Sequence, residues 1–417
     1  MDKAEKIPEG YRVTEAGILP VDWQVKRLSE VATELTERAG QDKYETVSIS
    51  AGVGFVNQAE KFGKELSGKQ YEKYIVLHQG DFSYNKGNSK TFPQGCIYRL
   101  NDRETAAVPN VFESFRIEDQ DADYYEQLFL SGFLNKQLYS KINRGVRDDG
   151  LLNLTGKDFY SCMIPVPPKD EQKKIAQILA QCDTVIELKE QRIEEERKKK
   201  VWLSQKLLTP SQNHADMWKC VCLSTLCKNI IDGDWIEAKD QSDDGIRLIQ
   251  TGNIGVGKYL DKPNRAKYIS EETFSTLKCT EVLNGDVLVS RLPDPIGRAC
   301  FIDGLQNRAI TAVDCSILRF ESLTMAKLFV QIASTNKYFN EIYNLAGGST
   351  RTRIARKELE KLRITIPVSK DYQEKILQIL FEQDRLIDAL VNEVDLLKSK
   401  KQAVMKLLLT GIVRVKL

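Results

Sequence analysis

The sequence predicts a mixed α/β (α+β) protein with a pseudo-twofold internal repeat. Two globular domains are joined by two long helices that form an antiparallel coiled coil. Three observations support this prediction. Motifs recur in the same order in both halves of the 417-residue chain, each half begins with a body of short strand-like and helix-like segments, and each half closes on a long charged helical stretch.

The internal repeat rests on ordered matches between the two halves. Their offset is nearly constant, which argues against chance similarity. The clearest pairs are Trp23-x4-Leu28-Ser29 with Trp218-x4-Leu223-Ser224, Gly52-Val53-Gly54 with Gly255-Val256-Gly257, Gly80-Asp81-Phe82 with Gly285-Asp286-Val287, Asn135-Lys136 with Asn336-Lys337, Ile164-Pro165-Val166 with Ile366-Pro367-Val368, and Asp170-x-Gln172-x-Lys174-Ile175 with Asp371-x-Gln373-x-Lys375-Ile376.

The two bodies mix predicted strands and helices without regular alternation. Short apolar runs between glycine and proline breaks indicate strands at 47–49, 74–77, 96–100, 112–117, 282–290, 299–302 and 316–320. Helices are expected at 124–139 and 325–343. The chain therefore divides into an N-terminal segment (1–22), a first domain (23–163), a first spacer helix (164–212), a second domain (213–365) and a second spacer helix (366–417).

Each repeat ends in a helix that follows a proline and starts with an acidic residue, Asp170 or Asp371, whose charge suits the helix N-terminus. The second helix has a heptad seam broken only by Lys401, whereas the first has polar residues at three seam positions, Lys189, Glu196 and Lys200. A helix of about 40 residues needs a packing partner in water. The alternative is that each helix lies on its own domain. The apolar seam residues are Ile186, Ile193, Leu203, Leu207, Ile387, Leu390, Val394, Leu397, Val404 and Leu408.

The overall composition constrains the class of protein. With 61 basic and 59 acidic residues the net charge is +2, so any nucleic-acid surface must be local. No apolar run reaches the roughly 20 residues of a membrane span, and residues 1–10 do not form a signal peptide. We expect a cytoplasmic protein with no membrane partner. Its nine cysteines are expected to be buried thiols.

Several motifs now form a familiar set. The segment Thr14-Glu15-Ala16-Gly17-Ile18-Leu19-Pro20-Val21-Asp22-Trp23 resembles the opening of the specificity subunits of type I restriction–modification enzymes. Gly285-Asp286-Val287-Leu288-Val289-Ser290-Arg291 is similar to their strand-and-loop motif. Ile164-Pro165-Val166-Pro167-Pro168, followed by Glu171-Gln172, resembles their junction between domain and helix. The resemblance covers essentially the whole chain, including the duplication.

The resemblance implies a non-catalytic, sequence-specific DNA-binding subunit with two target-recognition domains. Each domain would read one half of a bipartite double-stranded DNA site, and the helix pair would set their separation. Methyltransferase subunits would dock on the helix pair and supply S-adenosylmethionine for DNA methylation. A motor–nuclease subunit would bring ATP and magnesium. This chain is expected to hold no cofactor. It departs from the pattern where Tyr372 replaces the glutamate of the second junction and Ser369-Lys370 replaces the double proline.

Two pairs of loops are candidates for DNA contact. Arginine and asparagine suit base edges, lysine suits phosphate, and glycine lets the backbone approach closely. An ordinary polar turn or a helix C-cap remains an alternative at each position. The candidate residues are Tyr84, Asn85, Lys86, Asn88 and Lys90 with Arg144 and Arg147 in the first domain, and Arg291 and Arg298 with Arg351 and Arg353 in the second.

Catalytic motifs are weak throughout. Gly63-x4-Gly68-Lys69 resembles a phosphate loop, but Gln70 stands where Ser or Thr binds magnesium. Cys220, Cys222 and Cys227 with His214 do not match a zinc site, and no metal is expected. The alternatives to a specificity subunit are a DNA adenine methyltransferase or nuclease with its own site, for which Pro293-Asp294 is a poor match, and a coiled-coil adaptor that does not bind DNA.

Overall fold

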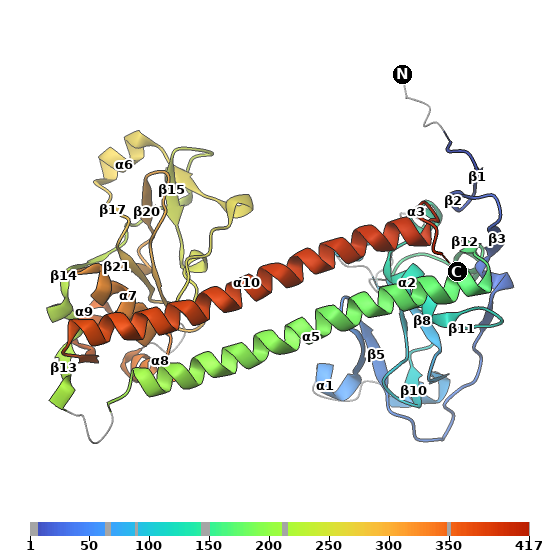
Figure 1. Cartoon of the computed structure of the whole chain (residues 1–417), viewed down its shortest axis with the longest axis horizontal. Coiled ribbons are helices and arrows are strands. Elements are labelled where there is room, and N and C mark those ends of the chain that lie inside the picture. Colours follow the sequence, from blue (N-terminus) through green and yellow to red (C-terminus); the bar gives the residue numbers. More distant parts are fainter. Residues whose placement is uncertain are drawn as a thin grey trace. The chain divides into compact units, whose positions relative to one another are not determined.

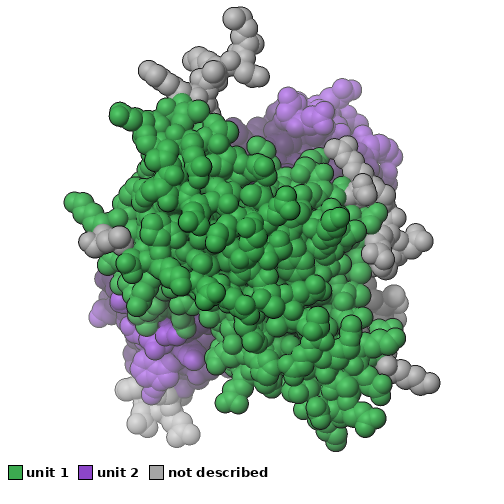
Figure 2. Space-filling model, turned by 90° about the vertical axis from the view of Figure 1, so that its right-hand side faces the viewer, with its two compact units in different colours: residues 1–189, 393–417 green, residues 190–392 purple. Residues whose placement is uncertain are grey.

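The computed structural model describes residues 7–62, 68–87, 91–142, 151–210, 216–347 and 352–416. The chain divides into two compact units, each described by itself below. Unit 1 comprises Met1–Lys189 and Glu393–Leu417, and unit 2 comprises Glu190–Asn392 (Figures 1 and 2). In Figure 2, residues 393–417 share the colour of residues 1–189 because they belong to one compact body.

The first domain lies in unit 1 and contains short strands and four short helices in its described part. Its strands are β1 (Tyr11–Thr14), β2 (Gly17–Pro20), β3 (Gln24–Arg27), β4 (Ala32–Glu34), β5 (Val47–Ser50), β6 (Gly54–Asn57), β7 (Ile75–His78), β8 (Phe82–Asn85), β9 (Cys96–Arg99), β10 (Thr105–Val108), β11 (Glu113–Ile117) and β12 (Met163–Val166). Its helices are α1 (Gln58–Phe62), α2 (Ala122–Leu130), α3 (Asn135–Lys141) and α4 (Gly156–Tyr160).

The second domain lies in unit 2 and follows a similar order. Its strands are β13 (Trp218–Cys222), β14 (Cys227–Asp232), β15 (Ile246–Ile249), β16 (Tyr268–Ile269), β17 (Glu281–Val282), β18 (Val287–Ser290), β19 (Ala299–Phe301), β20 (Ala309–Thr311), β21 (Cys315–Phe320) and β22 (Arg363–Pro367). Its helices are α6 (Glu271–Leu277), α7 (Leu323–Ile332), α8 (Asn336–Leu345) and α9 (Arg356–Lys361).

Both domains are built on the same four-stranded antiparallel sheet. The strand order is β4-β11-β8-β9 in the first domain and β14-β21-β18-β19 in the second. A two-stranded ribbon precedes the long helix in each repeat, β3 with β12 and β13 with β22. This shared topology, with mixed helix and strand content, confirms the predicted internal repeat.

The repeated Gly-Asp motif has a structural role in both sheets. Gly80 and Gly285 adopt positive φ angles of 96° and 99° in the turn before β8 and β18, where glycine has no steric cost. Asp81 is buried and pairs with Arg116 at 2.7 and 2.9 Å. Asp286 pairs in the same way with Arg319, at 3.1 Å. The motif therefore fixes a turn to the neighbouring strand.

Three predicted elements are divided in the structure. The predicted strand at 282–290 is two strands, β17 and β18, because the Gly285 turn interrupts it. The predicted helix at 124–139 is α2 and α3, separated at Gly132, whose φ is 73°. The predicted helix at 325–343 is α7 and α8, because Thr335 starts a new helix by accepting from the amide of Tyr338. Local capping overrides the hydrophobic pattern at these points.

The two spacer helices, α5 (Lys169–Leu207) and α10 (Lys370–Leu409), run without a break (Figure 1). In unit 1 the last turns of α10 join the core of the first domain, where Met405, Leu408 and Leu409 pack with Trp23 and the start of α5. In unit 2 the last turns of α5 pack with the start of α10 and with α7, where Leu203 and Leu207 lie against Ile376, Leu380 and Leu328. Each unit thus contains the beginning of its own helix and the end of the other repeat's helix, which confirms the predicted antiparallel pair. The alternative, each helix on its own domain alone, is wrong.

The apolar residues of the predicted seam are all buried or half-buried. Ile186, Ile193, Leu390, Val394 and Leu408 are buried. Half-buried positions are Leu203, Leu207, Ile387, Leu397 and Val404. No helix in the described ranges is long and apolar enough to cross a membrane.

Candidate functional site

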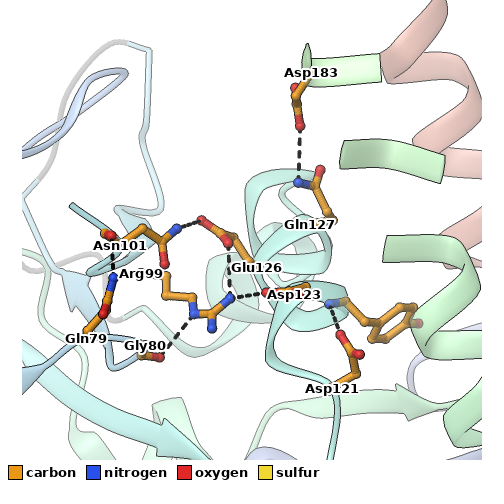
Figure 3. A network of polar contacts seen from close by, with 10 residues as sticks. Gln79, Gly80, Arg99, Asn101, Asp121, Asp123, Glu126, Gln127 and Asp183 are labelled. Carbon is orange, nitrogen blue, oxygen red and sulfur yellow. Dashed lines mark hydrogen bonds and ion pairs between the residues drawn. The ribbon is translucent and has the colours of Figure 1, made fainter. Parts of the chain in front are cut away.

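In unit 1, the polar seam residue Lys401 forms an ion pair with the opposite helix. Lys401 of α10 donates to both carboxylate oxygens of Asp183 of α5, at 2.5 and 2.7 Å. The amide of Gln127, which is buried on α2, donates to the same carboxylate at 3.3 Å (Figure 3). A side chain of the first domain and both helices therefore meet at Asp183.

Unit 2 contains the equivalent group of three residues. Lys200 of α5 pairs with Asp384 of α10, and Gln331 of α7 donates to Asp384 at 3.0 Å. Asp183 and Lys200 have the same separation in the chain as Asp384 and Lys401. The two groups are thus related by the repeat, and each joins a domain to both helices. This identical spacing was a signal in the sequence that pattern reasoning did not use.

The remaining polar seam residues of the first helix are also bonded across the helix pair. Glu196 accepts from Gln383 at 2.8 Å, and this hydrogen bond lowers the pKa of Glu196. Lys189 donates to Glu393 at 2.9 Å. A polar group in a helix interface favours the register in which it finds its partner. The polar residues that interrupt the apolar seam of the first helix therefore favour one alignment of the two helices.

The two junctions between strand ribbon and helix differ in chemistry. Glu171 at the start of α5 is buried and accepts from Trp23 at 3.0 Å and from Arg414 at 2.7 and 2.8 Å. Arg414 also binds Asp22, and this hydrogen bond lowers the pKa of Asp22. In the second junction Tyr372 takes the place of Glu171 and packs edge-on against Trp218. The first junction is therefore held by an ion-pair cluster, whereas an aromatic contact takes its place in the second junction.

The first candidate loop of the first domain is largely occupied by internal bonds. Tyr84 is fully buried, its hydroxyl donates to Gln94, and burial raises its pKa. Asn85 accepts from the amide of Gly87 at 2.8 Å and so shapes the turn. Lys86 forms a largely buried ion pair with Glu113 at 2.8 Å. Tyr84 is therefore not at the surface of the domain, and Asn88 and Lys90 lie outside the described residues.

The two arginines predicted to contact DNA from the loop of the second domain are buried. Arg291 is 7% exposed and Arg298 is 8% exposed. Arg298 donates to four backbone carbonyls, those of Thr251, Ile254, Leu292 and Pro295, and its burial lowers its pKa. Arg291 pairs with Asp232 and donates to the carbonyl of Ile354. In this conformation these arginines face inward and hold the loop in place, because their donors are used within the domain.

In each domain, the described segment that follows the second candidate loop bonds to the first candidate loop. The amide of Leu152 donates to the carbonyl of Lys86 at 2.9 Å, and the amide of Ile354 donates to the carbonyl of Arg291 at 3.2 Å. Arg353 is half-exposed and pairs with Asp314 at 3.1 Å. Arg144, Arg147 and Arg351 lie outside the described residues.

One surface feature of the second domain was missed by sequence reasoning. In unit 2 the residues of the 293–296 loop, helix α8 and Thr352 surround a hollow of about 290 Å³. Tyr343 of α8 lines it and is 72% exposed. The signal available in the sequence was the spacing of Asn336, Asn340 and Tyr343, which places them on one side of a helix.

No catalytic cluster accompanies these surfaces in the described part of the chain. No group of three or more His, Cys, Asp and Glu residues there is placed to hold a metal ion. Cys220 is exposed and contacts Arg363, burial raises the pKa of Cys227 to about 12, and His214 lies outside the described residues. His78 lies beside Glu37 at 3.2 Å on the surface.

The family model for the type I restriction modification DNA specificity domain matches the chain twice, at residues 20–196 and 216–396. The chain belongs to this family. It is similar to a putative type I restriction enzyme MjaX specificity subunit of Methanocaldococcus jannaschii, with 24% identity covering 98% of this chain and 97% of the relative. The MjaVIII specificity subunit of the same organism is 25% identical, covering 69% and 70% of the two chains.

Solved structures support the fold. The S subunit of a type I restriction–modification system from M. genitalium matches with a TM-score of 0.53 and 14% identity, covering 97% of each chain. A chain from a study of complex assembly and conformational transition of the type I R-M system matches with a TM-score of 0.58 and 18% identity, covering 95% of this chain and 99% of that one. The chain is a DNA specificity subunit without catalysis of its own, so both alternative functions are set aside.

Proposed function

We propose that each of the two domains reads one half of a bipartite, non-palindromic DNA site. The observation that carries this proposal is the presence of two copies of the DNA specificity domain in one chain. The copies share a four-stranded sheet but differ around it. The first has the separate ribbons β5-β6 and β7-β10, whereas the second has the sheet β16-β15-β20-β17. The two domains therefore share one sheet but differ in the strands around it, and this difference supports the reading of different base sequences.

The helix pair is proposed to act as the spacer between the two readers. A helix of 39 or 40 residues is about 60 Å long at 1.5 Å per residue, which exceeds the roughly 34–36 Å of one DNA turn. The cross-helix bonds of Lys189, Glu196, Lys200 and Lys401 favour one alignment of the two helices. A fixed alignment favours a fixed number of base pairs between the half-sites.

Methyltransferase and motor–nuclease subunits are the proposed protein partners. S-adenosylmethionine, ATP and magnesium then belong to those subunits, and this chain contributes sequence recognition. The chain's similarity to specificity subunits of type I restriction enzymes supports these partners.

Selection of duplexes from a random DNA library tests the proposal. The full chain is purified together with the methyltransferase subunits of its own system, and bound duplexes are sequenced. Two specified blocks separated by a constant run of unspecified bases are expected. A single continuous block, or no enriched sequence, would contradict bipartite reading.

A further inference from the structure

Helix α8 of the second domain has one buried side and one exposed side. Tyr338 and Ile342 face the domain core. Its exposed residues are Asn336, Lys337, Asn340, Tyr343, Asn344 and Leu345. None of these six residues carries a negative charge, and the one acidic residue of α8, Glu341, is half-buried, so the exposed residues of α8 add no charge that repels DNA.

The helix is locked to the neighbouring loop. The hydroxyl of Tyr338 donates to the carbonyl of Gly297 at 2.9 Å. A Cβ atom at Gly297 would lie 2.8 Å from the Ile342 side chain, so only glycine allows this close approach. Arg298 binds the carbonyls of Leu292 and Pro295 from beneath the loop. The loop and the helix are therefore held as one preorganised surface.

Between them lies the hollow of about 290 Å³. Its lining includes Pro293, Asp294, Ile296, Asn340, Tyr343 and Thr352. Among the described residues, no lysine or arginine lines it. Phosphate groups would need such cations, so the chemistry of the lining suits base edges instead. Asparagine can form two bonds to adenine, aspartate can accept from the amino group of cytosine, and apolar groups can contact the thymine methyl.

We infer that the exposed side of α8 enters the major groove and that Asn340 and Tyr343 contact the bases of one half-site. The inference rests on the proposed reading of one half-site by each domain. A B-DNA major groove admits an α-helix. Lys337, one turn before Asn340, is exposed and lies on the same side, where it can meet a phosphate. The buried Arg291 and Arg298 then act as positioning residues behind this surface.

Two single variants of the full chain test the inference, Asn340→Ala and Tyr343→Ala. Each variant is co-purified with its methyltransferase subunits and used to select random duplex DNA. We expect about tenfold or greater loss of affinity for the wild-type site. We also expect relaxed base preference confined to one half-site. Both side chains are exposed, so unfolding temperatures should match wild type.

A matched control variant lies in the same domain. Leu323→Ala removes a side chain that is 61% exposed at the start of α7. Leu323 lies beside Gly285, at the opposite end of β18 from Arg291. The affinity and base preference of the Leu323→Ala variant should stay within about twofold of wild type.

Tyr139→Ala changes α3, the corresponding helix of the first domain. This variant should relax the base preference in the other half-site.

The outcomes separate this inference from the proposed function. If wild type selects two blocks and both α8 variants select the same two blocks with unchanged affinity, α8 does not read DNA and the inference is wrong. Equal loss of preference in both half-sites would also contradict it. If wild type selects no bipartite sequence, the proposed function itself fails.

Discussion

Lys401 of the second spacer helix donates to both carboxylate oxygens of Asp183 in the first, at 2.5 and 2.7 Å. The repeat places Lys200 against Asp384 in the same relationship. Each aspartate also accepts from a glutamine of the adjoining domain. These groups therefore tie the alignment of the helices to the placement of a domain on them.

Lys401→Ala tests the first of these groups. The lysine side chain is 14% exposed and Asp183 is 48% exposed, so the expected loss in the free energy of unfolding is modest, about 1–2 kcal/mol. Denaturant unfolding measures it. Lys400→Ala is the control, since Lys400 is the exposed neighbour and should change stability by less than about 0.5 kcal/mol. In a double-mutant cycle with Asp183→Asn, independent effects of the two substitutions would contradict the coupling.

Arg414→Ala tests the ion-pair cluster of the first junction. It leaves Trp23 as the side-chain donor to the buried Glu171, and we expect the free energy of unfolding to fall by about 2 kcal/mol at neutral pH. Lys416→Ala, an exposed basic residue on the same tail, serves as the control and should be neutral.

The contribution of Asp22 to this cluster depends on pH. Its folded-state pKa is lowered below the ordinary value of 3.8 by the hydrogen bond from Arg414. The stability that this gives is complete well above pH 3.8 and is lost as pH falls through the lowered pKa. The difference in unfolding free energy between wild type and Arg414→Ala should therefore shrink below about pH 4. A difference that grows on acidification would contradict the assignment.

Arg298→Lys separates loop positioning from base contact. One ammonium group cannot reproduce the four carbonyl bonds of the guanidinium, so we expect a stability loss of about 2–4 kcal/mol. Thermal unfolding of the variant measures this change beside Arg308→Lys, an exposed arginine of the same domain. Unchanged stability together with altered base preference would mean that Arg298 reads bases directly.

The sequence predicted the features that depend on periodicity and order along the chain. The repeat, the two spacer helices and their apolar seam all follow from spacing alone. Element breaks were harder to predict, because Gly132, Gly285 and Thr335 act through local backbone geometry within otherwise continuous apolar patterns.

The candidate site was less predictable because exposure is a tertiary property. Arg291 and Arg298 have the composition of DNA-contacting residues, yet their guanidinium groups bond inside the domain. Tyr343 was not among the candidate contact residues, and its side chain is exposed. The partners of Lys200 and Lys401 lie on the opposite helix, so residue type alone could not identify them.

The central claim, that each domain reads its own half-site, is tested most directly by exchanging one domain. Residues 23–163 are replaced by the corresponding domain of a family member with a different target, and methylated bases in the host genome are located by single-molecule sequencing. We expect a new sequence in one half-site, with the other half-site and the spacing unchanged. A change in both half-sites would contradict the claim that each domain reads its own half-site. An unchanged site would also contradict it, provided that the exchanged chain folds and assembles with its partners.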